Sequence, residues 1–420
     1  MSDHLLFAGH EPRVGIADTR QLGTPAADGA LRLNSSAIRI EAVPGARLAD
    51  LQEAWRDLCA RADAANIFMN PVLVAIAGRA YGERKCLALL AWDHTAPVAR
   101  LMGVWAFAIG RAPYSPLPTE MLCSPAMPNA YLSTPVVDRS ALDAVLAAML
   151  EHIARDAHLP KIVALDAMGS DTATMRALER LLEARGAAPC VFSRSQRPHL
   201  SSTLDGKAYL EQAFSGPSRK KLRQRRRRLA EKGALTSTVI TEPAAVRAAV
   251  DDFLTLEASG WKGRERTALL CSGADADYVR AMIGALAAQG EAAIHTLALD
   301  GRAVSMQIVL RSGTSAFTWK TAYDESLHDL SPGTLLLEDY TTALLADPQV
   351  ADVDSCSLDD SGYMGIWRER AEITHLWFDS RPGGSLSFLI LSRLQAAYLR
   401  LRSRAKALYH DFKRQQPAKK

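Results

Sequence analysis

The chain has 420 residues, of which 48% are apolar and 23% are charged, and its formal net charge is only +4. This composition supports sizeable hydrophobic cores and excludes a polycation that binds nucleic acid over its whole surface. The six cysteines are far apart and form no C-x-x-C pair, which argues against a zinc or disulfide framework and favours a reducing cytoplasm. No secretory signal or membrane span is predicted, because Asp93, Pro97 and Arg100 interrupt the apolar stretch 87–109.

Composition and hydrophobic pattern divide the chain into four parts. Residues 1–36, rich in Gly, Ala, Asp and Thr, are predicted to be a flexible leader. Two compact units, 37–200 and 201–380, are expected to follow, and 381–420 is expected to form a basic amphipathic helix and tail.

The first unit alternates helical and strand patterns. Its predicted helices cover 48–63, 71–81, 140–157 and 173–185, and its predicted strands cover 85–92, 98–109, 161–166 and 190–193. Ser140 is expected to cap the helix 140–157, with Asp143 three residues on.

The second unit contains three apolar runs joined by turn signals. The turn Asp300-Gly301 follows the first run, and Ser312-Gly313 separates the second from the third, which predicts an antiparallel meander from 294 to 323. After a polar loop, 324–330, the group 331–334 has the residue types that start a helix. Its apolar face begins at the leucines 335–337.

The two units have the same order of elements. The hairpin 292–310, the helix 334–346 and the strand 351–357 correspond to strands 85–109, helix 140–157 and strand 161–166. We therefore predict a mixed α/β fold of two similar domains, each a largely antiparallel mixed sheet flanked by helices, plus a C-terminal helix.

The most basic stretch lies between the units, from Ser218 to Gly233. Ser218 is expected to cap a helix here and Gly233 to end it, while Leu222 and Leu229 form a narrow apolar seam. The other faces are cationic, which indicates either an anion-binding site or a solvated basic face. No aromatic residue is interleaved, which argues against stacking on single-stranded nucleic acid.

Several motifs occur in a fixed order in the chain: Tyr209-Leu210, Ser218-Arg219-Lys220, Leu222-Arg223, Arg228-Leu229, Gly233, Phe253-Leu254, Glu257 to Gly263, Leu299-Asp300-Gly301, Tyr323-Asp324, Ser331-Pro332-Gly333 and Trp367. Together they resemble the GNAT-superfamily acyltransferase domain of the CelD-type group, which is associated with cellulose biosynthesis. They are more distantly similar to FemAB-type aminoacyltransferases.

The resemblance spans residues 200–378 and implies transfer of an acyl group from acyl-CoA to an amine or sugar-linked acceptor in envelope or polysaccharide metabolism. Two features depart from it. The R/Q-x-x-G-x-G/A phosphate loop is absent, with Ser331-Pro332-Gly333 in its place, and Tyr363-Met364 stands where relatives often have Tyr-Lys.

Two alternatives to this activity remain open. One is a FemAB-like transferase that uses aminoacyl-tRNA, with the basic helix binding RNA. The other is a non-catalytic ligand-binding protein on the same scaffold. The sequence predicts no metal ion, and it leaves the oligomeric state open.

The predicted site has a donor part and a catalytic part. Backbone amides at a helix start bind phosphate, so the start of the helix at 331–334 and the basic helix are expected to hold the CoA phosphates. The predicted donor residues are Ser331, Gly333, Thr334, Arg219, Lys220 and Arg223.

A thioester acyl transfer also needs an acid for the leaving thiolate and a base for the amine. Tyr363 is the predicted acid, by its place after the strand 351–357, and a packing role is its alternative. The candidate bases are Glu257, Asp324, Asp359 and His295, of which Asp324 could serve only as a turn cap and His295 as a core histidine. The residues predicted to line the substrate pocket, with core packing as the alternative for the tryptophans, are Trp261, Lys262, Trp319, Tyr323 and Trp367.

The segment from 385 to about 412 predicts a last amphipathic helix. It combines a broad leucine-rich face with the cations Arg393, Arg400, Arg402, Arg404 and Lys406. Packing on the body or on a partner subunit is the expected fate of such a helix, and an anionic membrane surface is the alternative.

Overall fold

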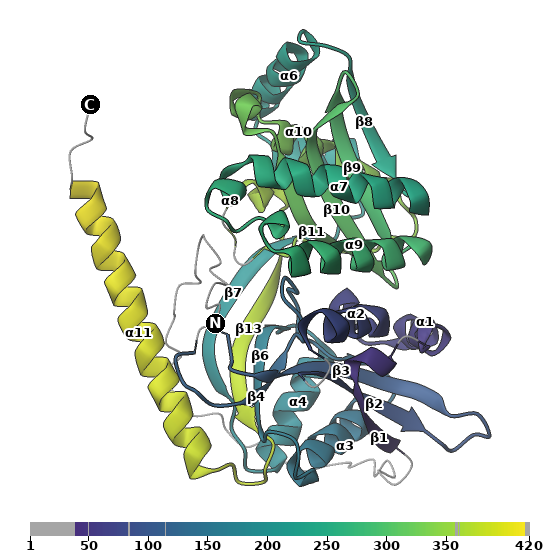
Figure 1. Ribbon diagram of the computed structural model, residues 1–420, viewed down its shortest axis with the longest axis vertical. Helices are drawn as coiled ribbons and strands as arrows, with labels where there is room; N and C mark the ends of the chain where they lie inside the picture. The colour runs from purple at the N-terminus through teal and green to yellow at the C-terminus, as the bar shows by residue number, and fades with distance from the viewer. Residues whose placement is uncertain are drawn as a thin grey trace.

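The computed structural model describes residues 38–48, 50–82, 85–113, 115–357, 360 and 362–415. Thirteen strands form one sheet, with helices on both faces and a long C-terminal helix along one side (Figure 1). The mixed α/β fold with two similar halves and a C-terminal helix is therefore confirmed. The leader and Asp359 lie outside the described residues.

The first half is built from the strands β1 to β7 and the helices α1 to α4. Its strands are β1 (Ile38–Pro44), β2 (Cys86–Asp93), β3 (Arg100–Gly110), β4 (Met121–Ser124), β5 (Val136–Val137), β6 (Ile162–Gly169) and β7 (Cys190–Leu200). Its helices are α1 (Gln52–Arg61), α2 (Pro71–Tyr81), α3 (Leu142–Arg155) and α4 (Ala173–Ala184).

The second half repeats this order after two linking helices. Its strands are β8 (Leu235–Ile240), β9 (Ala292–Leu299), β10 (Arg302–Ser312), β11 (Ser315–Tyr323), β12 (Asp352–Asp354) and β13 (Glu369–Asp379). The helices are α5 (Gly206–Ala213), α6 (Gly216–Ala230), α7 (Pro243–Ser259), α8 (Trp261–Arg264), α9 (Gly273–Ala288), α10 (Pro332–Ala346) and α11 (Leu386–Gln415).

The two halves exchange strands at the centre of the sheet. The strand order is β1-β2-β3-β4-β6-β13-β7-β12-β11-β10-β9-β8, so β13 from the end of the chain pairs with β6 of the first half. In turn, β7 pairs with both β13 and β12. Each half contains one parallel pair, β4 with β6 and β11 with β12, at corresponding places.

Local turn chemistry explains the β9–β10 hairpin. Asp300 and Gly301 have φ angles of 49° and 77°, the left-handed conformation that a tight two-residue hairpin needs and that Gly adopts without a steric cost. The helix α10 likewise begins as predicted, at Pro332, and Leu335, Leu336 and Leu337 are buried.

Three predictions about helix ends are corrected by the structure. The basic helix α6 begins at Gly216, because Ser215 rather than Ser218 accepts from the backbone at its start, and it ends at Ala230, before Gly233. The helix α3 has no side-chain cap, since the Ser140 hydroxyl donates to Asp138 instead.

The predicted polar loop 324–330 contains a 3-10 helix, η4 (Glu325–Leu330). The strand predicted over 351–357 is only three residues long, since it pairs with β11 from Asp352 to Asp354 and then leaves it.

Candidate functional site

The candidate donor site lies where β12 departs from β11. Their parallel pairing ends at Phe317 with Asp354, so within the described part of the chain no strand pairs with β11 on that side from Thr318 to Tyr323. Trp319 is an extra residue in β11, because Ile308 faces Lys320 while Val309 faces Thr318. Such a bulge bends the strand and re-aims side chains near functional sites. Backbone groups of β11 are thus free of strand pairing beside the bulge.

Tyr363 reaches this stretch from the 3-10 helix η5 (Tyr363–Ile366). Its hydroxyl lies within hydrogen-bonding reach of the hydroxyls of Thr321 and Tyr340. Although 39% of the residue is exposed, its hydroxyl faces protein, and this removal from water raises the pKa of the Tyr363 phenol. The phenol therefore carries its proton at neutral pH, as a general acid must.

The start of α10 lies on the same face of the sheet. Ser331 is left-handed with a φ of 49°, and no side chain caps the helix. Within the described residues the N–H of Gly333 donates to no protein acceptor. Gly333 also lies against the ring of Tyr323, since a Cβ added there would be 3.7 Å from that ring. Tyr363, Tyr323 and residues 331–334 are thus brought together.

The corresponding helix of the first half is not free in this way. Just before α3, the Asp138 carboxylate accepts from the Ser140 N–H at 2.9 Å and is paired with Arg61. A carboxylate of the chain itself therefore lies just before that helix start, where it would repel an anionic ligand.

The basic helix α6 lies against η4, and its predicted apolar seam enters the core cluster of the second half. Leu222 and Leu229 are buried, while Arg226 donates to Asp339 at 2.6 Å and to Glu338 at 3.1 Å. The contact to α10 is therefore made by Arg226, which the sequence did not single out.

Two of the three predicted anion ligands of α6 are exposed, and the third, Arg219, is half-buried. Arg219 is 3.4 Å from Glu211, and Lys220 and Arg223 face solvent. Among the residues that the structure describes, no hydrogen bond or ion pair joins these three side chains to the start of α10, so their role in donor binding stays a prediction.

The opposite face of β11 carries a second polar group. Lys320 follows Trp319 and precedes Thr321, so its side chain leaves the strand on the face away from Tyr363. Its ammonium donates to the side-chain oxygen of Asn129 at 2.8 Å and lies 5.6 Å from the centre of the Tyr131 ring. Burial lowers the pKa of Lys320, and the nearby Glu257 carboxylate opposes that shift.

Glu257 and Lys262 belong to this second group. The buried Glu257 carboxylate accepts from Lys262 at 2.7 Å and from the Leu269 N–H at 2.9 Å. Trp319 donates its indole N–H to the Asn129 carbonyl at 2.7 Å, so a loop of the first half lies beside Trp319 and Lys320 on this face. The sequence signal for Lys320, which was not used above, is that it is the single charged residue between Ser315 and Tyr323.

The remaining predicted residues lie in other surroundings. Asp324 caps η4 by accepting from the Ser326 N–H at 3.0 Å, and the half-exposed Trp261 begins α8. Trp367 is fully buried and donates to Thr341 at 2.9 Å. His295 is buried in β9, and burial lowers its pKa to about 4, so it is neutral at pH 7.

Met364 packs into the core of the second half. It is buried, and the Tyr340 hydroxyl lies 3.1 Å from its sulfur. The Met364 side chain points into apolar surroundings, where a flexible thioether packs well.

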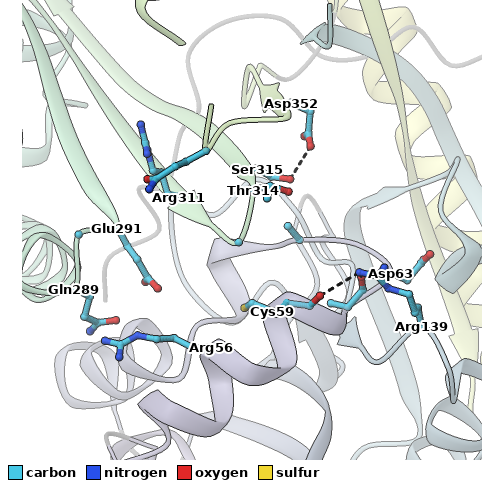
Figure 2. Close-up of a pocket in the computed structure, with 16 residues that line it drawn as sticks. Arg56, Cys59, Asp63, Arg139, Gln289, Glu291, Arg311, Thr314, Ser315 and Asp352 are labelled. Carbon is cyan, nitrogen blue, oxygen red and sulfur yellow. Dashed lines mark hydrogen bonds between the residues drawn. The ribbon is translucent and has the colours of Figure 1, made fainter. Parts of the chain in front are cut away.

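A cavity of about 620 Å³ lies at the other end of β11, between α1 and the second half. Arg56, Gln289 and Glu291 gather at one end of it (Figure 2). Glu291 accepts from Asn70 of the first half at 2.9 Å, and its burial raises its pKa to about 7 against the opposing effects of Arg56 and Asn70. Within the described residues, no group of three or more His, Cys, Asp or Glu is placed to hold a metal ion.

Part of the second half matches a known family model. Residues 217–359 match the family model described as an acetyltransferase (GNAT) domain. This GNAT match covers the bulged strand β11, η4 and the start of α10, and it stops before Tyr363. No curated protein matches the chain.

Solved structures resemble most of the chain. The crystal structure of FemX is similar over 84% of this chain and 100% of its own, with 13% identity and a TM-score of 0.56, which shows a common fold. The C-terminal domain of a putative lysylphosphatidylglycerol synthetase from Agrobacterium fabrum has 14% identity, a TM-score of 0.49 and coverages of 84% and 96%. A tandem GNAT protein from the clavulanic acid biosynthesis pathway has 14% identity, a TM-score of 0.41 and coverages of 82% and 99%.

Proposed function

We propose that the protein is an N-acyltransferase that moves an acyl group from an acyl-CoA to an amine, with the donor bound by its second half. The observation that carries this proposal is the departure of β12 from β11 at Phe317, beside the uncapped start of α10 and the hydroxyl of Tyr363. Backbone amides at a helix start attract phosphate, and the α10 start is half-exposed. The sequence resemblance to the CelD-type group supports a sugar-linked amine of envelope or polysaccharide metabolism as the acceptor.

In this proposal, the two substrates bind on opposite faces of β11, each beside one of the two polar groups. The donor thioester lies on the α10 face beside Tyr363, and the acceptor amine approaches from the face of Lys320 and Glu257. The amine nitrogen attacks the thioester carbon, the carbon–sulfur bond breaks, and the Tyr363 phenol gives its proton to the leaving thiolate. An unpaired backbone N–H of β11 stabilises the oxyanion of the intermediate.

Glu257 is the candidate base that lies on the acceptor face. Its two oxygens accept from Lys262 and from the Leu269 N–H, which leaves lone pairs for the proton of the amine. Asp324, by contrast, is engaged in capping η4 on the far side of the strand end.

Calorimetric titration with CoA, acetyl-CoA and longer acyl-CoAs tests the proposal. We expect saturable heat and a raised melting temperature with at least one of them. Gly333→Asp places a carboxylate where the phosphate would lie and is expected to weaken donor binding by about tenfold or more. Gly273→Asp is the matched control, since it adds the same charge to the start of α9 in open space. No heat and no thermal shift with any acyl-CoA rejects the proposal.

A second candidate function is transfer from an aminoacyl-tRNA. Solvent-facing cations at Lys220, Lys221, Arg223, Arg227 and Arg228 favour it, because they outnumber what the phosphates of one CoA would neutralise. Binding of RNA by such a helix would fall steeply with salt, and the reaction would be lost on ribonuclease treatment. A reaction that resists ribonuclease leaves the acyl-CoA proposal in place.

A further inference from the structure

Among the described side chains of α11, the buried ones lie in its first ten positions. Phe388, Ser392 and Gln395 are buried, and Phe388 joins a small cluster with Trp377 of β13. Beyond this attachment the helix continues along the side of the first half and points away from the body (Figure 1). Most of α11 therefore has a face that the body does not cover.

The uncovered face is apolar. Its large side chains are widely exposed, and they follow one another at helical spacing: Leu386 (71%), Ile390 (49%), Leu394 (50%), Leu401 (65%) and Leu408 (71%). Residues three, four or seven positions apart lie on one side of a helix, so these five form a single stripe, which we call the outer stripe. From Leu386 to Leu408 it spans 22 residue steps, roughly 33 Å of helix at 1.5 Å each.

Cations border the outer stripe. Arg393, Arg400 and Arg404 are exposed, and each lies three residues after Ile390, Ala397 or Leu401 on the same side of the helix. No Asp or Glu occurs between Leu386 and His410. The outer face of α11 is thus an apolar stripe with a purely positive border.

The charges beside the outer stripe indicate what kind of partner can bind there. Two copies of α11 packed stripe to stripe would bring identical cations together without a compensating carboxylate, which disfavours a coiled coil between copies. No helix in the described ranges is long and apolar enough to cross a membrane, so α11 does not qualify as a span. An anionic lipid surface satisfies both features, since leucines enter the interface and arginines reach the headgroups.

We propose that the outer stripe and the arginines of α11 bind the protein to the surface of anionic membranes. The helix then lies in the plane of the interface, and its attached first turns hold the catalytic body beside the lipid. This inference is independent of the donor proposed above, because none of its residues belongs to the β11 site.

Flotation of the full chain with lipid vesicles tests this inference. We expect binding to vesicles of phosphatidylcholine with 30% phosphatidylglycerol and little binding to pure phosphatidylcholine. Arg393→Gln, Arg400→Gln and Arg404→Gln together should weaken partitioning about a hundredfold, at roughly tenfold or less per cation. Leu394→Asp with Leu401→Asp should lower it at least tenfold, because apolar burial in the interface is lost.

The second basic helix provides the matched control. Lys220→Gln, Lys221→Gln and Arg223→Gln remove the same charge from α6, which has no exposed large apolar side chain among its described residues, and vesicle binding should persist. Equal loss in the α6 variant would mean binding by bulk charge and would overturn the inference. A lipid-free dimer that Leu394→Asp and Leu401→Asp dissociate, measured by light scattering, would instead assign the outer stripe to a second copy.

Discussion

Arg197 and Asp354 form an ion pair in the interior, where the two halves meet. Arg197 belongs to β7 of the first half, and Asp354 is the last residue of β12 before that strand leaves β11. The same guanidinium donates to the Tyr131 carbonyl at 2.8 Å, and Asp354 also accepts from the Cys356 N–H at 2.8 Å. This pair therefore holds the end of β12, the departing chain and the loop that faces Lys320.

Removing the guanidinium should strongly destabilise the protein. Arg197→Met leaves the Asp354 carboxylate buried without its partner, which costs about 3–5 kcal/mol of unfolding free energy. Urea denaturation measures this change. Arg155→Met breaks the exposed pair with Glu151 and is expected to cost less than about 1 kcal/mol. Equal changes in the free energy of unfolding for the two substitutions would show that the interior pair stabilises the protein no more than the exposed one.

Tyr363→Phe should slow the reaction and spare donor binding. The phenol is protonated at neutral pH, and burial of its hydroxyl raises its pKa further. The substitution therefore removes the proposed acid but keeps the aromatic ring. We expect kcat to fall about a hundredfold while the Kd for acyl-CoA stays within about twofold. Steady-state kinetics and calorimetry measure the two. Tyr81→Phe, whose hydroxyl bonds Asp275 away from β11, is the control. Unchanged kcat in Tyr363→Phe removes this residue from the mechanism.

Glu291 should make stability fall with rising pH. Its pKa of about 7 in the folded protein lies above the ordinary value of 4.5, so the folded state holds the proton more tightly than the unfolded state. Stability is therefore highest below pH 4.5 for this group and decreases as pH rises through 7, by on the order of 2 kcal/mol after allowance for its partial exposure.

Glu291→Gln tests this dependence at the cavity of Figure 2. The amide cannot ionise, so urea denaturation between pH 5 and 8 should show a flatter profile than that of the parent protein. Arg56 is the nearby cation, and Arg56→Gln should raise the pKa of Glu291 further and steepen the fall. A parent profile that rises with pH, with no difference in Glu291→Gln, would contradict the assignment.

Met364→Lys restores the residue type that the resembling family often has, and it should destabilise this protein. The sulfur lies in the buried cluster with Tyr340 and Trp367, so an ammonium there would be desolvated without a carboxylate partner. We expect a loss of about 2–4 kcal/mol in urea denaturation. Met364→Leu, which conserves volume, should change stability by less than about 1.5 kcal/mol. A stable, more active lysine variant would show that the position reaches the site.

Features that depend on residues close together in the sequence agree best with the structure. The hairpin turn at Asp300-Gly301, the start of α10 and the basic helix α6 were predictable, because turn chemistry and periodicity act over a few residues. Cap positions shifted by a few residues where a neighbouring serine competed, as Ser215 did for Ser218.

The sequence by itself determined two repeats of one element order, their buried faces and the positions of the charged helices. Only the tertiary structure showed that β7 and β13 are exchanged between the halves. Neighbouring strands are joined by backbone hydrogen bonds, and the alternation of side chains along a strand shows which face is buried but not which strand lies next to it. It also decided that Lys320 meets Asn129 and that Arg197 meets Asp354, contacts between residues more than 150 positions apart. Such contacts arise when folded elements pack, and no local pattern in the chain encodes them.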